Sequence, residues 1–277
     1  SEEKLTRIYP QKNLFSHIIG QIDDDNNGIS GLEKSFDAKL KENKSPLQLT
    51  VDVDIQFLIR RELIKFQKIF RAKGSAAILM DVNNGDIISM VSLPDFNLNK
   101  RKTITDVNYI NKITKGVYEL GSVFKPFTFT AGLNEGVIET ETMFLNLPKS
   151  IPCAGFVIRE YDKDMPSNIT AEQILIRSGN IGSVRIAQRV EKLEKNRFKS
   201  FLEKIGVLSQ IDFDIEEVAI QQKFSWGKCK LATASFGHGV TTTILQLAKG
   251  YSVIANGGFN INPRLIKDSK KKIKKGK

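Results

Sequence analysis

Hydrophobic residues in the first third of the chain recur at intervals of three or four positions. They stand at Ile55, Ile59, Leu63, Phe66 and Phe70. This spacing predicts a helix that is capped by Asp52 or Asp54 and stops at Gly74. We expect the aromatic side chains of this helix, Phe57, Phe66 and Phe70, to pack in a core rather than to form a binding surface.

The residues after this helix predict a β-hairpin. Two apolar segments, 76–82 and 86–93, flank the dipeptide Asn84-Gly85, which favours a two-residue type I′ turn. Later helices are predicted near residues 172–177, 181–193, 197–205 and 243–255.

A serine and a lysine stand three residues apart in the segment Tyr118-Glu-Leu-Gly-Ser-Val-Phe-Lys-Pro126. Residues at this spacing share one face of a helix, with Cβ atoms roughly 5–6 Å apart. Lys125 can therefore reach the hydroxyl of Ser122 and, when desolvated and neutral, take its proton. Pro126 falls in the first turn, where a missing N–H costs least. The following apolar residues, Phe127, Phe129, Ala131 and Leu133, are expected to carry the helix into a core.

The Ser-x-x-Lys pattern is weakly specific by itself. It also occurs at Ser1/Lys4, Ser225/Lys228 and Ser269/Lys272. The alternative interpretation of Ser122 and Lys125 is a helix-capping serine beside a solvated lysine.

A second pattern favours the catalytic interpretation. The segment Arg177-Ser-Gly-Asn-Ile-Gly182 holds the only Ser-x-Asn in the chain, and it follows a helix that opens with a capping box at Thr170-Ala-Glu-Gln173. A hydroxyl and a carboxamide two residues apart in a loop can point into one cleft. There the hydroxyl relays a proton and the carboxamide holds a peptide amide.

Together these motifs resemble those of class B penicillin-binding proteins, most of all the cell-division (septal) branch. The resemblance covers nearly the whole chain. Its other matches are Arg7-Ile-Tyr-Pro10, Gly28-Ile-Ser-Gly-Leu-Glu33, Leu49-Thr-Val-Asp52, Asp81-Val-Asn-Asn-Gly-Asp86, Ser235-Phe-Gly-His-Gly239, Leu245-Gln-Leu-Ala248 and Ile254-Ala-Asn-Gly-Gly258. The Ser-Phe-Gly-His-Gly form and the Arg-x-Tyr-Pro opening favour the septal over the elongation branch.

The resemblance implies an α+β fold of the penicillin-binding protein/β-lactamase-like transpeptidase type, with an antiparallel sheet flanked by helices. Residues 1–46 would end an N-terminal anchor or linker domain of the dimerisation type, and residues 47–277 would form an incomplete transpeptidase domain. The third family motif, Lys-Thr-Gly or Lys-Ser-Gly, is absent from the chain. We therefore expect a piece of a longer, membrane-anchored protein that lacks the C-terminal strands of the fold.

The resemblance also implies roles for individual residues. Ser122 would attack the penultimate carbonyl of a D-Ala-D-Ala stem peptide, with Lys125 as the base, and Ser178 would pass the proton to the departing amine. The resulting acyl-enzyme would react with the amine of a neighbouring stem. Asn180, with Gly179 and Gly239, would bind the substrate. No cofactor and no metal are expected.

The expected partners follow from the same resemblance. They are peptidoglycan stem peptides, β-lactams, division-machinery membrane proteins and the membrane itself, through an N-terminal anchor that is missing from this chain. The parent protein would be anchored in the cytoplasmic (inner) membrane, with its catalytic domain in the periplasm.

Two other functions stay open. One is a binding or scaffold module of the division machinery without chemistry, which the absent third motif favours. The other is a D,D-carboxypeptidase or β-lactam-hydrolysing relative, in which water replaces the acceptor amine. A serine–histidine hydrolase is disfavoured because the chain has no Gly-x-Ser-x-Gly nucleophile elbow. We expect His238 to lie in a glycine-lined turn near the cleft, in a packing role.

Composition changes this picture little. Hydrophobic residues make up 40% of the 277 residues, enough for a sizeable core. Residues 267–277 hold seven Lys and one Asp, so this tail supplies +6 of the net charge of +11. Such a run is more often a solvated loop than a binding surface, and we expect no nucleic-acid partner. Cys153 and Cys229 are too few for a disulfide scaffold, and the sequence leaves open whether they form one bridge.

Overall fold

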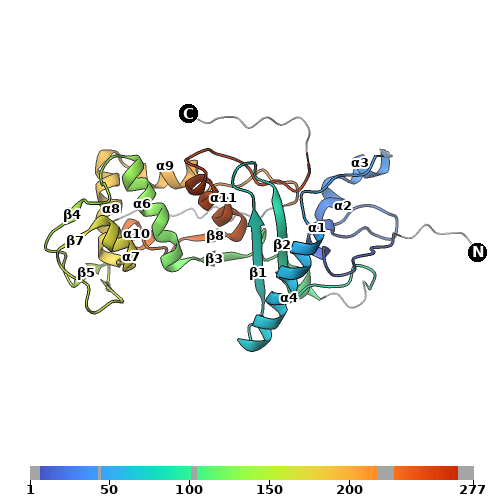
Figure 1. The fold of residues 1–277 in the computed structure, drawn as a ribbon, viewed down its shortest axis with the longest axis horizontal. Coiled ribbons are helices and arrows are strands. Elements are labelled where there is room, and N and C mark those ends of the chain that lie inside the picture. The colour runs from blue at the N-terminus through green and yellow to red at the C-terminus, as the bar shows by residue number, and fades with distance from the viewer. Residues whose placement is uncertain (1–6, 43–44, 101–104, 217–227, 268–277) are drawn as a thin grey trace, which may run out of the picture. The chain divides into compact units, whose positions relative to one another are not determined.

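The structure is a computed structural model that describes residues 7–42, 45–100, 105–216 and 228–267 (Figure 1). The chain folds into two compact units. Unit 1 comprises residues 1–117, 210–219 and 243–277, and unit 2 comprises residues 118–209 and 220–242. Among the described residues, no helix is both long enough and apolar enough to cross a membrane.

In its described residues, unit 1 contains a β-hairpin and a set of helices. Its elements are α1 (Ser16–Ile19), α2 (Gly31–Ser35), α3 (Asp37–Glu42), α4 (Val53–Ile69), β1 (Ser75–Met80), β2 (Ile87–Leu93), α5 (Asp106–Tyr109) and α11 (Ile244–Ala255). The two strands pair antiparallel, with Ser75 opposite Leu93. Both α4 and α11 pack against the hairpin (Figure 1).

The predicted hairpin is confirmed, but its turn is not of type I′. That type requires positive φ at both central residues, and only Gly85 has it, with φ of 81°. The carboxylate of Asp81 instead accepts the N–H of Asn83 at 2.8 Å, and the N–H of Gly85 donates to the Asp81 carbonyl at 2.9 Å. These local hydrogen bonds make a wider turn.

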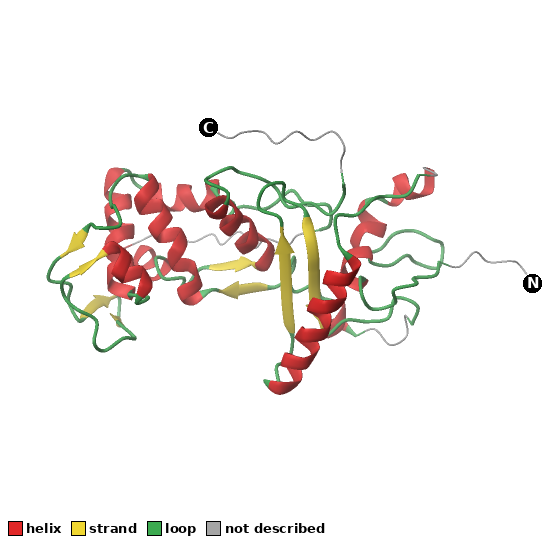
Figure 2. Ribbon diagram, in the orientation of Figure 1, coloured by secondary structure: helices red, strands yellow, loops and turns green. Residues whose placement is uncertain are grey.

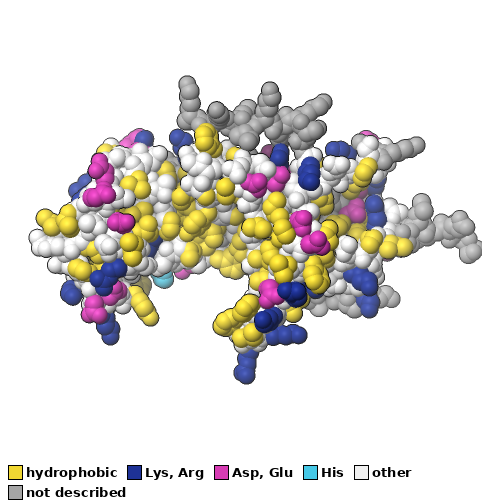
Figure 3. All heavy atoms as spheres, viewed as in Figure 1, with side chains coloured by type: hydrophobic (Ala, Val, Ile, Leu, Met, Phe, Trp, Pro, Cys, Tyr) yellow, Lys and Arg dark blue, Asp and Glu magenta, His cyan; other side chains and the backbone are white. Residues whose placement is uncertain are grey.

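The helix predicted from residue 54 is confirmed, and Asp52 caps it by accepting the N–H of Ile55 at 2.9 Å. The expectation that its aromatic residues lie in a core is wrong. Phe57, Phe66 and Phe70 are 55%, 47% and 74% exposed. Figure 3 shows hydrophobic side chains at the surface over α4, beside Lys and Arg. Helical period places residues on one face, but it does not determine what covers that face.

A buried glutamine joins α4 to the hairpin. Gln56 is 1% exposed. Its amide nitrogen donates to the carbonyls of Leu14 and Met90, at 3.0 and 2.9 Å. Its amide oxygen accepts from the hydroxyl of Ser89 at 2.7 Å and from the N–H of Met90 at 2.9 Å. Both donor and both acceptor positions of the Gln56 amide are therefore used.

The main core of unit 1 draws on both sides of residue 46. Phe15, Ile18 and Leu32 pack in one cluster with Ile87 and Met90. The assignment of residues 1–46 to a separate linker domain stays a prediction.

Unit 2 is mostly helical. Its elements are β3 (Val117–Glu119), which begins at the unit boundary, the 3-10 turn η2 (Gly121–Phe124), α6 (Lys125–Asn134), β4 (Met143–Phe144), β5 (Ser150–Cys153), β6 (Phe156–Arg159), β7 (Ile169–Thr170), α7 (Ala171–Ile176), α8 (Asn180–Leu193), α9 (Arg197–Lys204), α10 (Lys228–Ala234) and β8 (Thr241–Thr243). The strands pair as β3 with β8, β4 with β7 and β5 with β6 (Figure 2).

The core of unit 2 forms where α6 packs against α8 and α9. Phe124 and Phe127 are fully buried, whereas Leu133 is 47% exposed, so the sequence correctly placed the start of α6 in a core but not its end. The helices predicted after residue 172 are confirmed as α7, α8, α9 and α11. The predicted α+β class with antiparallel strands is confirmed as well.

Replacing Gln56 by Leu should destabilise the protein by about 2–4 kcal/mol, because buried groups of β2 then lose their partners at about 1–3 kcal/mol each. Urea denaturation followed by circular dichroism measures this loss. Gln67→Leu on the same helix is the control, since Gln67 is only half-buried and accepts one hydroxyl, that of Ser75. Equal losses in the two variants would contradict the assigned role of Gln56.

Candidate active site

The predicted Ser122–Lys125 pair is formed at the start of α6. Ser122 is exposed and lies in the 3-10 turn η2, and Lys125 is the first residue of α6. The lysine is 1% exposed, and its Nζ donates to Ser122 Oγ at 3.2 Å. The alternative of a solvated lysine is therefore wrong, and Ser122 is not the N-cap of either helix, since those positions are Leu120 and Phe124.

Ser178 completes the surroundings of the lysine amine. Lys125 Nζ donates to Ser178 Oγ at 2.9 Å and also to the Ser178 carbonyl oxygen. Ser178 lies between α7 and α8 with φ of 55°, in the left-handed region, which an L-residue occupies only when its surroundings hold it there. The structure thus brings three of the predicted site residues into direct contact, with the amine between two hydroxyls.

Burial changes the proton affinity of this amine. It lowers the pKa of Lys125 to about 8 because the charged form is desolvated, while the negative charge of Glu160 acts in the opposite direction. An appreciable fraction of the amine is then neutral near neutral pH. The neutral amine can take the proton of Ser122, and Ser178 Oγ is within reach to receive a proton in turn.

Asn180 is the first residue of α8, and Gly179 occupies the N-cap position. The Asn180 side-chain nitrogen donates to the carbonyl of Arg159 at 2.8 Å. Because a carbonyl only accepts, the nitrogen of the carboxamide faces Arg159 and its oxygen is the end left to accept a ligand N–H. The backbone N–H of Gly179 is used internally, since it donates to Ile174 at 2.7 Å.

The carboxylate of Glu160 binds the N-terminal end of α8. The sequence motifs do not indicate this residue. Glu160 accepts the backbone N–H of Asn180 at 2.6 Å and that of Ile181 at 2.8 Å. Glu160 stands far upstream of α8 in the sequence, so no local capping pattern could have indicated it.

The segment Ser235–Gly239 contacts Gly121, the residue before the nucleophile. The N–H of Gly121 donates to the Gly237 carbonyl at 3.1 Å, and a Cβ at Gly237 would lie 2.1 Å from the Gly121 carbonyl oxygen. Only glycine permits this approach. Thr128 of α6 donates to the Ser235 carbonyl at 2.7 Å and so fixes the same segment.

Gly239 and His238 end this segment. The N–H of Gly239 donates to Glu119 Oε1 at 2.9 Å, so this donor is already used and a role of Gly239 in substrate binding stays a prediction. His238 was expected to pack, but its side chain is 70% exposed, with Nδ1 4.0 Å from Glu119 Oε2. The glycines on both sides of it, Gly237 and Gly239, have positive φ of 78° and 71°, so His238 lies in a glycine-lined turn as expected.

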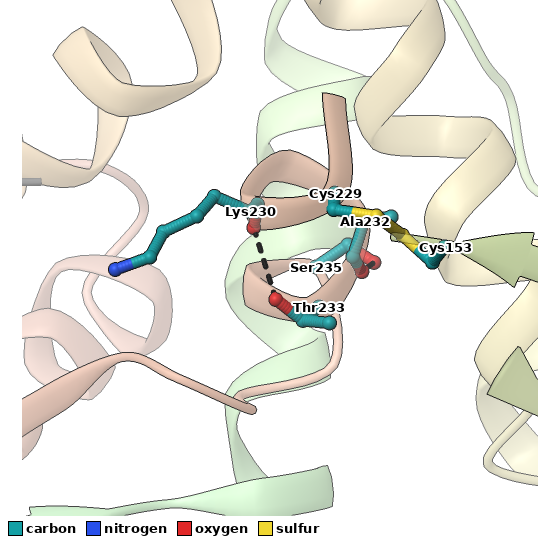
Figure 4. The surroundings of a disulfide bond; sticks show 6 residues. All are labelled: Cys153, Cys229, Lys230, Ala232, Thr233 and Ser235. Carbon is teal, nitrogen blue, oxygen red and sulfur yellow. Dashed lines mark hydrogen bonds between the residues drawn. A yellow bond between two sulfur atoms is a disulfide. The ribbon is translucent and has the colours of Figure 1, made fainter. Parts of the chain in front are cut away.

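A disulfide that the sequence left open joins β5 to α10. Cys153 and Cys229 are bonded, with Cα atoms 5.4 Å apart (Figure 4). Both lie in a hydrophobic cluster with Ile181 and Ala232. Helix α10 leads directly into the Ser235–Gly239 segment, so the bridge links the strand pair that precedes Glu160 to the segment that contacts Gly121.

Residues 75–277 match the model of the penicillin binding protein transpeptidase domain. The chain belongs to this family. The resemblance found in the sequence motifs and the transpeptidase fold that it implied are both confirmed.

Two of the curated relatives of this chain are named as peptidoglycan D,D-transpeptidases. The chain is 29% identical to the probable peptidoglycan D,D-transpeptidase FtsI of Caulobacter vibrioides over 93% of its own length and 44% of the relative. It is 27% identical to the peptidoglycan D,D-transpeptidase FtsI of Escherichia coli K12, over 93% of its length and 47% of that protein. The chain thus spans slightly less than half the length of these relatives.

Solved structures agree with the fold assignment. The chain superposes on the crystal structure of apo penicillin binding protein 3 from Mycobacterium tuberculosis with a TM-score of 0.79 at 26% identity. The match covers 95% of this chain and 61% of that chain. The same protein complexed with aztreonam gives a TM-score of 0.80 over the same shares.

Replacing both cysteines by alanine should lower the stability of the transpeptidase domain. The bridge closes a loop with a sequence separation of 76, and a loop of that length contributes about 4 kcal/mol in the chain-entropy model. Thermal unfolding with and without dithiothreitol measures the effect. Reductant should lower the melting temperature of the parent and leave that of the Cys153→Ala/Cys229→Ala variant unchanged. A parent protein whose melting temperature is the same with and without reductant would show that the bridge does not contribute to stability.

Proposed function

We propose that the full-length gene product is a serine D,D-transpeptidase that cross-links peptidoglycan stem peptides during cell division. The observation that carries this proposal is the buried amine of Lys125, held between the hydroxyls of Ser122 and Ser178. A buried cation costs free energy, and a scaffold module would gain nothing from placing one beside an exposed serine. The names of the relatives support the substrate class.

The first half of the reaction forms an acyl-enzyme. Ser122 Oγ attacks the carbonyl carbon of the penultimate D-Ala while neutral Lys125 takes the hydroxyl proton. We infer that the backbone N–H of Ser122 stabilises the oxyanion, because N–H groups at a helix start lack partners within the helix. The C–N bond then breaks, and Ser178 passes a proton to the nitrogen of the departing D-Ala.

The second half transfers the acyl group. The amine of a neighbouring stem peptide attacks the ester carbonyl of Ser122, its proton returns through Ser178 and Lys125, and the ester C–O bond breaks to restore the hydroxyl. The carboxamide oxygen of Asn180 accepts an amide N–H of the donor peptide and keeps it aligned. Water in place of the amine would make the same site a carboxypeptidase, so the products separate the two reactions.

We propose that β-lactams acylate the same serine, because their strained amide takes the place of the D-Ala-D-Ala bond. The aztreonam complex of the related penicillin binding protein 3 supports this. We propose a periplasmic site for the domain, with anchorage in the inner membrane and division-machinery proteins as partners. The disulfide supports an oxidising compartment, since such bridges persist outside the cytosol.

Fluorescent penicillin should form a covalent adduct on Ser122 of the full-length protein. Peptide mass spectrometry locates the adduct. Ser122→Ala should abolish labelling, whereas Ser225→Ala, which removes the serine of another Ser-x-x-Lys, should label at the parental rate. An adduct on Ser225 or Ser178, or labelling of Ser122→Ala, would refute the assignment.

Lys125→Met should slow acylation by roughly 10²–10⁴-fold, the contribution of a positioned general base. Lys125→Arg should fail as well, because a guanidinium keeps its proton. The parental rate should rise with pH and level off above the pKa of about 8, since only the neutral amine reacts. Stopped-flow acylation between pH 6 and 10 tests this, with Lys199→Met as control, a partly exposed lysine of α9 that pairs with Glu203. A parental rate in Lys125→Arg would exclude the lysine as base.

A further inference from the structure

The start of α8 is capped from outside the helix. Helices usually satisfy their first N–H groups with a Ser, Thr, Asp or Asn side chain at the N-cap. Here the N-cap is Gly179, which makes no side-chain bond. The carboxylate of Glu160 supplies the acceptors instead, with one oxygen on the N–H of Asn180 and the other on that of Ile181.

Packing explains why the cap is not local. A Cβ added at Gly179 would lie 3.1 Å from Ile174 Cγ2, and one at Gly182 would lie 2.4 Å from the same atom. The turn between α7 and α8 therefore excludes a larger N-cap side chain without a shift of Ile174, which is 1% exposed. A carboxylate that arrives from another element avoids this collision.

Two consecutive residues, Arg159 and Glu160, bind the side-chain nitrogen and the backbone N–H of Asn180. Glu160 accepts the backbone N–H, and the carbonyl of the preceding residue, Arg159, accepts the side-chain nitrogen at 2.8 Å. Arg159 is the last residue of β6, so the pair is carried by the strand pair β5–β6. Asn180 can neither shift along the helix axis nor rotate its carboxamide without breaking one of these bonds.

The charge of Glu160 also reaches the base. Its carboxylate favours the protonated form of Lys125 and so opposes the lowering of the lysine pKa by burial. Asp162 and Arg177 near this turn are bonded to each other at 2.8 Å from Arg177 Nε to Asp162 Oδ2. Lys149, Arg159 and Lys163 line the same pocket as Glu160. A change at Glu160 therefore alters both the alignment of Asn180 and the titration of the base.

We propose that Glu160 is a positioning residue of this active site, which acts through Asn180 by holding the first turn of α8 and the carboxamide that binds the donor peptide. The inference rests on the proposed acylation of Ser122. It assigns Glu160 no contact with substrate.

The test compares Glu160→Gln and Glu160→Ala with the parent in the full-length protein. Fluorescent penicillin is the probe, and its saturation kinetics give the apparent dissociation constant and the acylation rate constant separately. Glu172→Ala, an exposed glutamate in the first turn of α7, is the matched control and should behave as the parent.

Glu160→Ala should lower the ratio of acylation rate constant to dissociation constant about 10- to 100-fold, the usual effect of a misplaced active-site group. Glu160→Gln keeps one acceptor oxygen and should recover part of that loss. Both variants lose the negative charge, so the midpoint of their pH–rate profiles should move below that of the parent. A purely structural role would lower the amount of folded protein but would leave the rate ratio of the folded fraction at the parental value.

The outcomes separate this inference from the proposed function. A parent that forms no adduct on Ser122 refutes both. A parent that is acylated, together with a Glu160→Gln variant that keeps the parental rate ratio, overturns the role of Glu160 alone. This second criterion also decides the question if Glu160→Ala does not fold.

Discussion

The burial of the Lys125 amine is the constraint on which the rest of the candidate site depends. An amine removed from water needs hydrogen-bond partners, because an unpaired buried charge is expensive. Lys125 finds them in Ser122 and Ser178. The same burial lowers the pKa of the amine to about 8 and so makes it a base under mild conditions. The hydrogen bonds of the Lys125 amine, its lowered pKa and its contact with Ser122 thus all follow from the burial of this amine.

That placement is stabilised by the core of unit 2. Phe124 precedes the lysine and Phe127 follows it, and both are fully buried, so the start of α6 is fixed while Ser122 stays exposed. Gly237 allows the Ser235–Gly239 segment to touch Gly121 on one side. On the other side, Glu160 and Arg159 hold Asn180. The disulfide joins the elements that carry these two supports, and all of these residues lie within a single compact unit.

The sequence by itself determined the features that depend on local spacing. Periodic apolar residues predicted α4 because neighbours on a helix face are three or four positions apart. Thr170 was predicted as a cap, and it accepts the N–H of Gln173. The Ser-x-x-Lys and Ser-x-Asn motifs identified the family, because their residues lie close together in the chain.

Tertiary structure alone decided the features that depend on distant parts of the chain. The exposure of Phe57, Phe66 and Phe70 depends on which elements cover α4, and helical period cannot reveal that. The turn at Asn84-Gly85 is shaped by hydrogen bonds to Asp81, which override the preference of the dipeptide Asn-Gly for a type I′ turn. The pairing of Cys153 with Cys229 and the contact of Glu160 with α8 join residues 76 and 20 positions apart. Such contacts are set by the path of the folded chain, which brings these groups within bonding distance only after the helices and strands have packed.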